Sequence, residues 1–488
     1  MQLLTYLLIT PAAGAAITAL VPGTYPRVVR AIAMAASALA LVLAWGPLLS
    51  QFNAAEVGLQ FYEFVKWNPR LGTAYALGVD GFSLPMVLLA TVLCFVALLA
   101  STSIREQVKG YYILMLLLQS AILGVFMAQD WALFYVFWEL TLIPLFFLID
   151  RWGGQQRHGA ALNFVLYTMG GSVFLLIALL TTFDSLPGHT FNMADMATGA
   201  RALPGPTQLL LFLGLLIGFG VKMPIFPMHG WLPLAHVQAP SPVSILLSGV
   251  LLKMGSYGLV RTVEMLPGAV IQLQGLLVSL AIISLIYGGL LAWRQHDLKA
   301  MIAYSSISHM GVVLLGIATL NQAGLTGAIM QMVAHGLVAG VLFLLIGLLY
   351  ERTHTRDVNH YSSLARVTPR FAFFTTLAFV AAVSMPGTAG FIAELHAMIG
   401  GWQRWGWLVL VMSIGVLISA AYAIRTVSRL FTGPVREEMK NIHDLRATEM
   451  LAAGTLTAGT ITLGVFPGPA LQIMATSVNQ LSNLLIAY

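Results

Sequence analysis

Four ionisable residues lie inside long apolar runs of the sequence: Glu139, Lys222, Lys253 and Glu394. A charged side chain at the centre of a membrane helix costs roughly 2.5–3.5 kcal/mol, and such residues usually mark ion or proton pathways. Burial disfavours the charged form, whereas an opposite charge nearby restores it. A lysine whose partner can move would therefore take up and release protons. The alternative is that the four charges are static ion pairs that hold helices together.

Two histidines are candidates to link these charges. His309 lies in AYSSISHMG beside three serines that could order water, and His335 lies in QMVAHGLVAG among small apolar neighbours. We predict that both relay protons between the lysines and Glu394. For His335 the alternative of a satisfied core histidine stays open.

Proline and glycine interrupt the two runs that carry Lys222 and Glu394. Pro224 and Pro227 follow the lysine directly, and Pro386–Gly390 precedes the glutamate. Proline removes a backbone donor and clashes with the preceding turn, so both helices should break there. Broken helices that face a cavity near the membrane midplane are typical of ion-translocating folds. We also predict that Glu139 and Lys222 form a pair, directly or through one water.

The composition excludes a water-soluble enzyme. Of 488 residues, 58% are hydrophobic and 9% charged, against roughly 25% charged in ordinary globular proteins. Cys94 is the only cysteine, which excludes a disulfide, an iron–sulfur cluster or a thiolate zinc site within this chain. His229 and His236 are not spaced as a helical metal pair and have no acid near them, so no metal is assigned.

Apolar runs long enough to cross a membrane predict an all-α integral membrane protein with about fourteen spans. Their approximate extents are 2–21, 28–49, 79–102, 110–128, 129–150, 160–183, 207–227, 242–264, 269–291, 298–318, 323–350, 369–400, 404–432 and 446–467. The seventh and the twelfth are the broken ones.

The basic residues indicate the orientation of these spans. With the N-terminus outside, most of the 24 lysines and arginines fall in the inner loops, and the outer loops hold only Lys66, Arg70, Arg201, Arg261 and Arg404. This asymmetry predicts both termini on the lumenal or periplasmic side. The charges are spread too thinly to indicate nucleic-acid binding.

An internal repeat is predicted because Lys222 and Glu394 occupy similar broken spans in the two halves. Five spans are an odd number, so the second unit must be inverted relative to the first. The predicted units are 1–109 with helices 1–3, 110–264 and 265–432 with five helices each, and 433–488 with the last helix.

Several motifs in order resemble one known family. HGWLPLAHVQAPSPVSILLSGVLLKMGSYGLVR, WELTLIPLFFLID, AYSSISHMG and MPGTAGFIAEL resemble the antiporter-like NuoM/NdhD subunit of respiratory complex I and its photosynthetic relatives, over about residues 80 to 467. The forms LLKMGSYGLVR and GFIAEL are more similar to the subunit of cyanobacteria and plastids. The resemblance implies fourteen spans in two inverted five-helix units. It also implies that Glu139, Lys222, Lys253 and Glu394 are the family's key glutamate, broken-helix lysine, next-span lysine and terminal glutamate.

The chain departs from the family pattern at three positions. Leu234 stands where the family commonly has Asp, Gln238 where it has an acid, and Gly390 where some members have Asn. These departures put in doubt any access route that relies on acids at the mouth of the seventh span. They suggest a specialised paralogue, for which a carbon dioxide-uptake complex is one expectation.

The resemblance implies a proton-translocating subunit of a complex I-like NAD(P)H or ferredoxin:plastoquinone oxidoreductase. The quinone and the iron–sulfur clusters would belong to partner subunits, and this chain would hold no cofactor. Expected partners are other membrane subunits, a redox arm and lipid. The expected location is a cyanobacterial thylakoid membrane or, alternatively, a bacterial plasma membrane. Two rival functions stay open: a Mrp-type cation/proton antiporter subunit, and a membrane scaffold whose charges are structural.

Overall fold

The computed structural model describes residues 2–488, and most of them are helical. The longer helices are α1 (Leu3–Leu20), α2 (Pro26–Leu43), α4 (Ser83–Ala100), α5 (Val108–Met127), α6 (Trp131–Leu140), α7 (Leu142–Trp152), α8 (Arg157–Ser185), α10 (Gly205–Lys222), α13 (Leu252–Met265), α15 (Gln274–Arg294), α16 (Leu298–Ala318), α17 (Gln322–Thr353), α19 (Pro369–Ala382), α20 (Ala389–Trp405), α21 (Leu408–Phe431), α22 (Ala447–Val465) and α23 (Gly468–Ile486).

Short helices connect or extend these. They are α3 (Leu49–Gln51), α9 (Met193–Arg201), α11 (Trp231–Gln238), α12 (Ser241–Leu246), α14 (Pro267–Gln272) and α18 (Leu364–Val367), with π-helical turns at Ala44–Leu48 and Leu247–Leu251 and 3₁₀ turns at Ser101–Ser103, Val358–His360 and Glu437–Met439.

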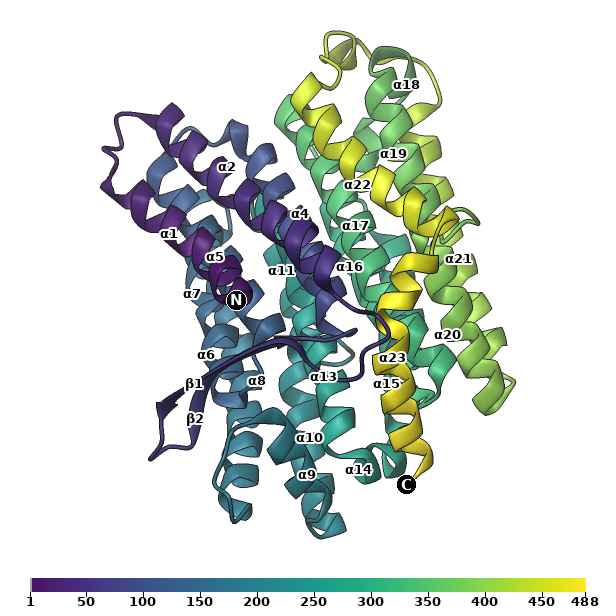
Figure 1. The fold of residues 1–488 in the computed structure, drawn as a ribbon. Coiled ribbons are helices and arrows are strands. Elements are labelled where there is room, and N and C mark those ends of the chain that lie inside the picture. Colours follow the sequence, from purple (N-terminus) through teal and green to yellow (C-terminus); the bar gives the residue numbers. More distant parts are fainter. Residues whose placement is uncertain (1) are drawn as a thin grey trace.

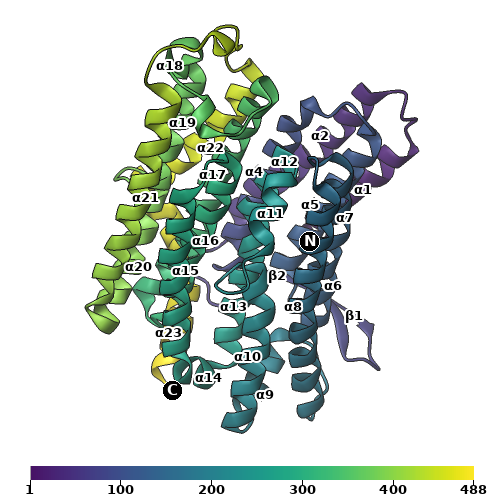
Figure 2. The same ribbon diagram turned by 180° about the vertical axis from the view of Figure 1, so that it is seen from behind.

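The helices stand side by side in two groups (Figures 1 and 2). Helices α1, α2 and α5–α8 form one group, α15 and α19–α21 the other, and α4, α11 and α13 lie between them. All residues in the apolar window of Ser241–Met265 are buried, and nearly all of those in α16 and α17. A helix that is apolar all round is a core helix. The centre of the bundle is therefore α12–α13, α16 and α17, which carry Lys253, His309 and His335.

Within the described residues, twelve helices are long and apolar enough to cross a membrane, or thirteen if the bent pair α22 and α23 counts as one. The all-helical membrane fold is confirmed, but the count of fourteen is not. The predicted twelfth span is divided into α19 and α20, and neither piece alone has the roughly 20 residues that a span needs. The predicted last span does not end the chain, because α23 follows α22 at an angle of 70°.

Both predicted breaks are confirmed. Helix α10 ends at Lys222 and α11 begins at Trp231, while α19 ends at Ala382 and α20 begins at Ala389. Neighbouring groups satisfy the backbone that the first break frees: the Phe226 N–H donates to Ser284 Oγ at 2.9 Å, and the Trp231 indole N–H donates to the Val221 carbonyl at 2.8 Å. The division into two repeat units stays a prediction.

A β-hairpin that the sequence analysis did not anticipate projects from one end of the bundle. Strands β1 (Gln60–Asn68) and β2 (Thr73–Val79) pair antiparallel, and the hairpin lies at the same end as α9 and α14 (Figure 1). Runs of about 20 apolar residues do not reveal such a hairpin, because strands are short and alternate in polarity.

Candidate functional site

The first part of the predicted axis lies between α6 and α10. The Lys222 ammonium, at the last residue of α10, donates to Thr141 Oγ1 at 3.2 Å and lies 4.9 Å from the centre of the Trp138 ring. Trp138 and Thr141 flank Glu139 in the chain. Oε1 of Glu139 is buried and makes no hydrogen bond.

Glu139 and Lys222 were predicted to pair directly or through one water. Within the described residues they form no direct ion pair, so the direct alternative is wrong. The ammonium is held instead by a hydroxyl and by the face of an indole, which attracts a cation. Thr141 separates α6 from α7, and this irregularity brings its hydroxyl to Lys222. The form of the prediction with one water between the carboxylate and the ammonium stays a prediction.

The second part begins at Lys253, which is fully buried in α13. Its ammonium donates to the Ser248 carbonyl at 2.5 Å and lies 2.7 Å from Nδ1 of His335. Ser248 belongs to the π-helical turn Leu247–Leu251. Such a turn disturbs the regular i→i−4 hydrogen bonding and is frequent at functional sites. Here a carbonyl of this turn accepts from the ammonium.

From His335 the polar contacts continue to Glu394. The rings of His335 and His309 lie 5.3 Å apart, and Nδ1 of His309 lies 3.6 Å from Oε1 of Glu394. Nε2 of Gln331 lies 3.1 Å from the same His309 nitrogen. A cavity of about 10 Å³ borders His309 and Glu394, close to the space that one water needs. Four of the six predicted residues thus form one series across α13, α17, α16 and α20.

Close packing of glycines joins the two parts of the axis. Helix α13 packs on the end of α10, where a Cβ on Gly255 would lie 2.6 Å from the Phe219 carbonyl oxygen and 2.7 Å from the Met223 nitrogen. Small residues let helix backbones approach closely in a membrane. Gly255 therefore allows the helices of Lys222 and Lys253 to touch. The small residues of KMGSYG are the one feature of the sequence that points to this contact, and it was not predicted.

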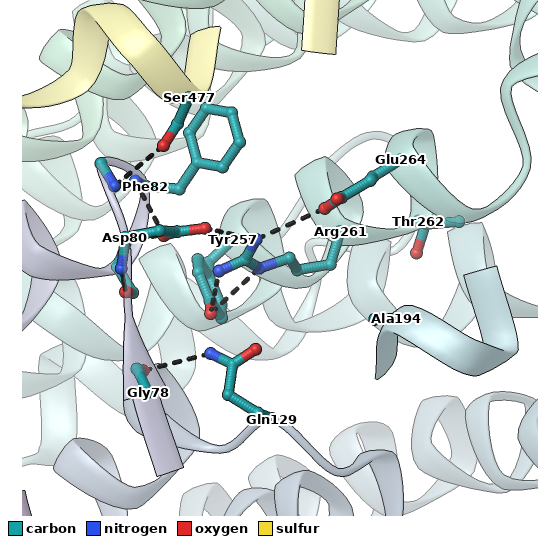
Figure 3. Close-up of polar contacts among 12 residues, drawn as sticks. Gly78, Asp80, Phe82, Gln129, Ala194, Tyr257, Arg261, Thr262, Glu264 and Ser477 are labelled. Carbon is teal, nitrogen blue, oxygen red and sulfur yellow. Dashed lines mark hydrogen bonds and ion pairs between the residues drawn. The ribbon is translucent and has the colours of Figure 1, made fainter. Parts of the chain in front are cut away.

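Arg261 corrects the loop assignment made from the sequence. It lies inside α13 rather than in an outer loop and is only 7% exposed. Its Nη1 lies 2.7 Å from Asp80 Oδ2, and its Nε and Nη2 donate to the Tyr257 hydroxyl at 3.1 and 3.0 Å (Figure 3). Removing Arg261 from the outer loops strengthens the charge asymmetry.

Asp80 is the buried partner of Arg261 and lies between β2 and α4. Burial alone would raise the pKa of Asp80, but the Arg261 guanidinium and the N–H groups of Ser83 and Phe82 hold that pKa below its usual value. The next residue, Gly81, donates its N–H to Ser477 Oγ of α23 at 2.9 Å (Figure 3). This cluster connects the end of the hairpin to α13 and α23.

A cavity of about 550 Å³ lies beside the Asp80–Arg261 pair, at the hairpin end of the bundle. Its charged lining residues are Asp80, Arg201, Arg261 and Glu264. Two acids and two bases leave the lining without net charge, and Arg201 is already engaged with the Glu264 carbonyl at 2.7 Å. The cluster therefore holds elements together rather than offering a free charge to a ligand.

No metal site is found among residues 2–488, which contain no group of three His, Cys, Asp or Glu side chains placed to hold an ion. His229 precedes Trp231, the first residue of α11, and packs against Phe226 and Tyr287, whereas His236 lies within α11 and stacks on Phe343.

A bundle of buried helices with two interrupted spans and lysines at its centre is typical of ion-translocating membrane proteins. Residues 128–419 match the family described as NADH:quinone oxidoreductase/Mrp antiporter, TM. The chain belongs to this family.

Relatives cover nearly the whole chain. NAD(P)H-quinone oxidoreductase chain 4 2 of Thermosynechococcus vestitus is 40% identical over 480 residues, which are 96% of this chain and 90% of that protein. NADH-quinone oxidoreductase subunit M of Rhodobacter capsulatus is 39% identical over 495 residues, 98% of this chain and 96% of that protein. The predicted resemblance is confirmed.

Solved structures of related chains have the same fold. A chain of respiratory complex I from Thermus thermophilus with bound NADH superposes with a TM-score of 0.90 at 30% identity, covering 99% of both chains. A chain of the Mrp complex from Dietzia has a TM-score of 0.83 at 23% identity and covers 99% of this chain but 55% of that one. The second likeness is one of fold.

Proposed function

We propose that this chain is the proton-translocating membrane subunit of a complex I-like NAD(P)H or ferredoxin:quinone oxidoreductase. Protons would pass along Glu139, Lys222, Lys253, His335, His309 and Glu394. The observation that supports the proposal is the row of buried groups from Lys253 to Glu394. Lys253 and His335 lie 2.7 Å apart, the ring centres of His335 and His309 lie 5.3 Å apart, and His309 lies 3.6 Å from Glu394. Single waters can bridge the gaps between these groups.

The Lys253–His335 contact supports proton sharing. Two basic nitrogens 2.7 Å apart cannot both be positive without strong repulsion, so the pair holds one proton between them. A second proton that arrives displaces the first toward His309. Among the described residues, Glu394 is the one carboxylate in contact with this series, so it is the natural acceptor at its end.

The partners follow from the relatives. The NAD(P)H-quinone oxidoreductases named above are complexes, and we propose that this chain joins other membrane subunits, a redox arm and surrounding lipid. The quinone, plastoquinone in a thylakoid membrane, and the iron–sulfur clusters would be held by those partner subunits. A bacterial plasma membrane is the alternative, because the Rhodobacter relative is as similar as the cyanobacterial one.

A carbon dioxide-uptake complex is the finer proposal for the type of assembly. Leu234 and Gln238, which replace the family's acids, border a cavity of about 680 Å³ at the end of the bundle where the basic loops lie. Gln238 uses its amide oxygen to accept from the Gln156 N–H at 3.0 Å. This neutral mouth supports a specialised variant.

The test uses the whole complex in sealed vesicles with Lys222→Ala, Lys222→Arg and Lys253→Met. All three are expected to lower the proton-to-electron ratio. Lys222→Ala and Lys253→Met remove the group that carries the proton, and the guanidinium of Lys222→Arg holds a charge but cannot release its proton. Normal pumping by Lys222→Arg would contradict the proposal and favour the scaffold. Sodium-dependent transport by a complex without quinone reductase activity would favour the Mrp-type antiporter instead.

A further inference from the structure

Three arginines lie at the basic-loop end of α15 and α21, away from the sites described above. Arg294 is the last residue of α15, and Arg425 and Arg429 lie one turn apart near the end of α21. Nη1 of Arg425 donates to the carbonyl of Trp293, the residue before Arg294. This bond places the guanidinium of Arg425 beside Arg294, with Arg429 on the next turn of the helix.

The charges of these arginines are not balanced within the chain. Among the described residues, no carboxylate forms an ion pair with any of the three. Arg425 and Arg429 donate to neutral oxygens, the Trp293 carbonyl and the side-chain amide of Asn359. The acid of that loop, Asp357, accepts from the N–H groups of Asn359 instead. Like charges that lie together repel one another, and an anion from outside the chain would balance them.

Next to the arginines, the same two helices expose apolar side chains. Helices α15 and α21 pack against one another, and α21 lies at the edge of the bundle (Figure 2). On these helices Leu290, Trp293, Leu417 and Ile424 are 43% to 69% exposed. An exposed tryptophan near the end of a membrane helix marks the level of the lipid headgroups. The arginines therefore lie among headgroups, and the apolar side chains face acyl chains.

Phosphate is the anion that suits this arrangement, since a planar guanidinium group forms paired hydrogen bonds with it. Basic sites between membrane helices on the cytoplasmic side bind anionic lipid headgroups. A free phosphate ion would balance the arginines but leave the apolar side chains beside them without a partner. A lipid with a phosphate headgroup matches both surfaces. The combination of cations with an adjoining apolar face therefore favours an anionic diacyl lipid.

We propose that Arg294, Arg425 and Arg429 bind the phosphate of one anionic diacyl lipid, with its acyl chains along α15 and α21. The lipid belongs to the leaflet on the side of the basic loops. Its headgroup joins the ends of two helices that are distant in the sequence. The site uses no residue of the proton axis, so it stands or falls independently of the proposed function.

The experiment places the assembled complex in phosphatidylcholine nanodiscs with a trace of lipid that carries a photoreactive diazirine in one acyl chain. Phosphatidylglycerol and phosphatidylcholine versions of this probe are compared. Mass spectrometry measures how much of each is cross-linked to the α21 peptide that contains Leu417 and Ile424. The phosphatidylglycerol probe is expected to label this peptide more strongly. Each single replacement of the three arginines by Gln should lower the ratio of the two labellings about fivefold, the contribution of one basic residue near an anionic headgroup.

Arg294→Gln is the sharpest variant, because Arg294 is exposed at the end of α15 and its replacement disturbs no packing. Arg425→Lys keeps a charge and a donor for the Trp293 carbonyl, and it should retain most of the preference should Arg425→Gln fail to assemble. The matched control is Arg27→Gln. Arg27 is an exposed arginine in the first turn of α2, in the other group of helices, and its replacement should leave the ratio unchanged.

Four results would overturn the proposal. The first is equal labelling by the two probes, or no label on this peptide, which would mean that a partner subunit covers the face. The second is an unchanged preference after replacement of all three arginines by Gln. The third is an equal loss of preference in Arg27→Gln, which would indicate general surface charge. The fourth is loss of the preference on addition of inorganic phosphate, which would assign the arginines to a free anion rather than to a lipid.

Discussion

The Asp80–Arg261 pair predicts a large and specific loss of stability. Asp80→Asn keeps an oxygen to accept from the Phe82 and Ser83 N–H groups but removes the charge opposite Arg261. A buried ion pair that loses one partner costs about 3–5 kcal/mol, because the other charge is left uncompensated. Glu264, at 3.4 Å from the same Nη1, remains as a weaker partner, so the lower end of that range is expected.

The assay is equilibrium unfolding of the purified complex in detergent, with the free energy of unfolding compared between variants. The double variant Asp80→Asn with Arg261→Met removes both charges and is expected to recover most of the loss, since apolar replacement of a buried pair is often neutral. A loss below about 1 kcal/mol for Asp80→Asn, the value of an exposed pair, would refute the reasoning. So would a double variant whose loss equals the sum of the two single losses.

The same pair sets a pH dependence. Because the pKa of Asp80 is held below its usual value in the folded chain, its contribution to stability is fully present above the unfolded pKa of about 3.9. That contribution should vanish only as the pH falls through the lower, folded pKa. The pair should therefore add no pH dependence near neutrality, and Asp80→Asn should flatten the acid limb of the stability curve.

Further variants test the axis and its packing. Gly255→Val places methyl groups against the Phe219 carbonyl and the Met223 nitrogen; it should cost about 1–3 kcal/mol of stability, whereas Gly454→Ala, which meets nothing within 4 Å, should cost little in the same unfolding assay. Glu394→Gln removes the carboxylate beside His309 and should lower the proton-to-electron ratio in vesicles while the complex still assembles; an unchanged ratio would remove Glu394 from the path.

The sequence predicted those features that depend on residue type and on the local chain. Apolar runs located the spans within a few residues, and proline located both breaks, because a missing N–H acts at its own position. The hairpin escaped, since runs of about 20 apolar residues do not reveal short strands. Arg261 was counted with the outer loops although the predicted span 242–264 contains it, and α13 extends past it to Met265.

Contacts between distant parts of the chain were harder to predict. The Lys253–His335 contact joins residues 82 apart, and no spacing rule places them together. Glu139 and Lys222 were predicted to pair directly or through one water, and the direct form is wrong for a physical reason: the Thr141 hydroxyl and the Trp138 ring occupy the place beside the ammonium. Membrane depth indicated that both charges would need partners, but not which partners.

Helix α13 carries two buried cations that differ in one respect, and the difference bears on whether the central charges are static. The charge of Arg261 is compensated: its guanidinium lies 2.7 Å from the Asp80 carboxylate, and two of its nitrogens donate to the Tyr257 hydroxyl. Lys253, two turns earlier, has only a carbonyl and an imidazole nitrogen. Lys222 and Lys299 likewise donate to neutral oxygens. A structural cation needs the compensation that Arg261 has, because burial of an uncompensated charge is costly. Lysines that lack it can become neutral without leaving a carboxylate unpaired, and this freedom is what a proton carrier requires.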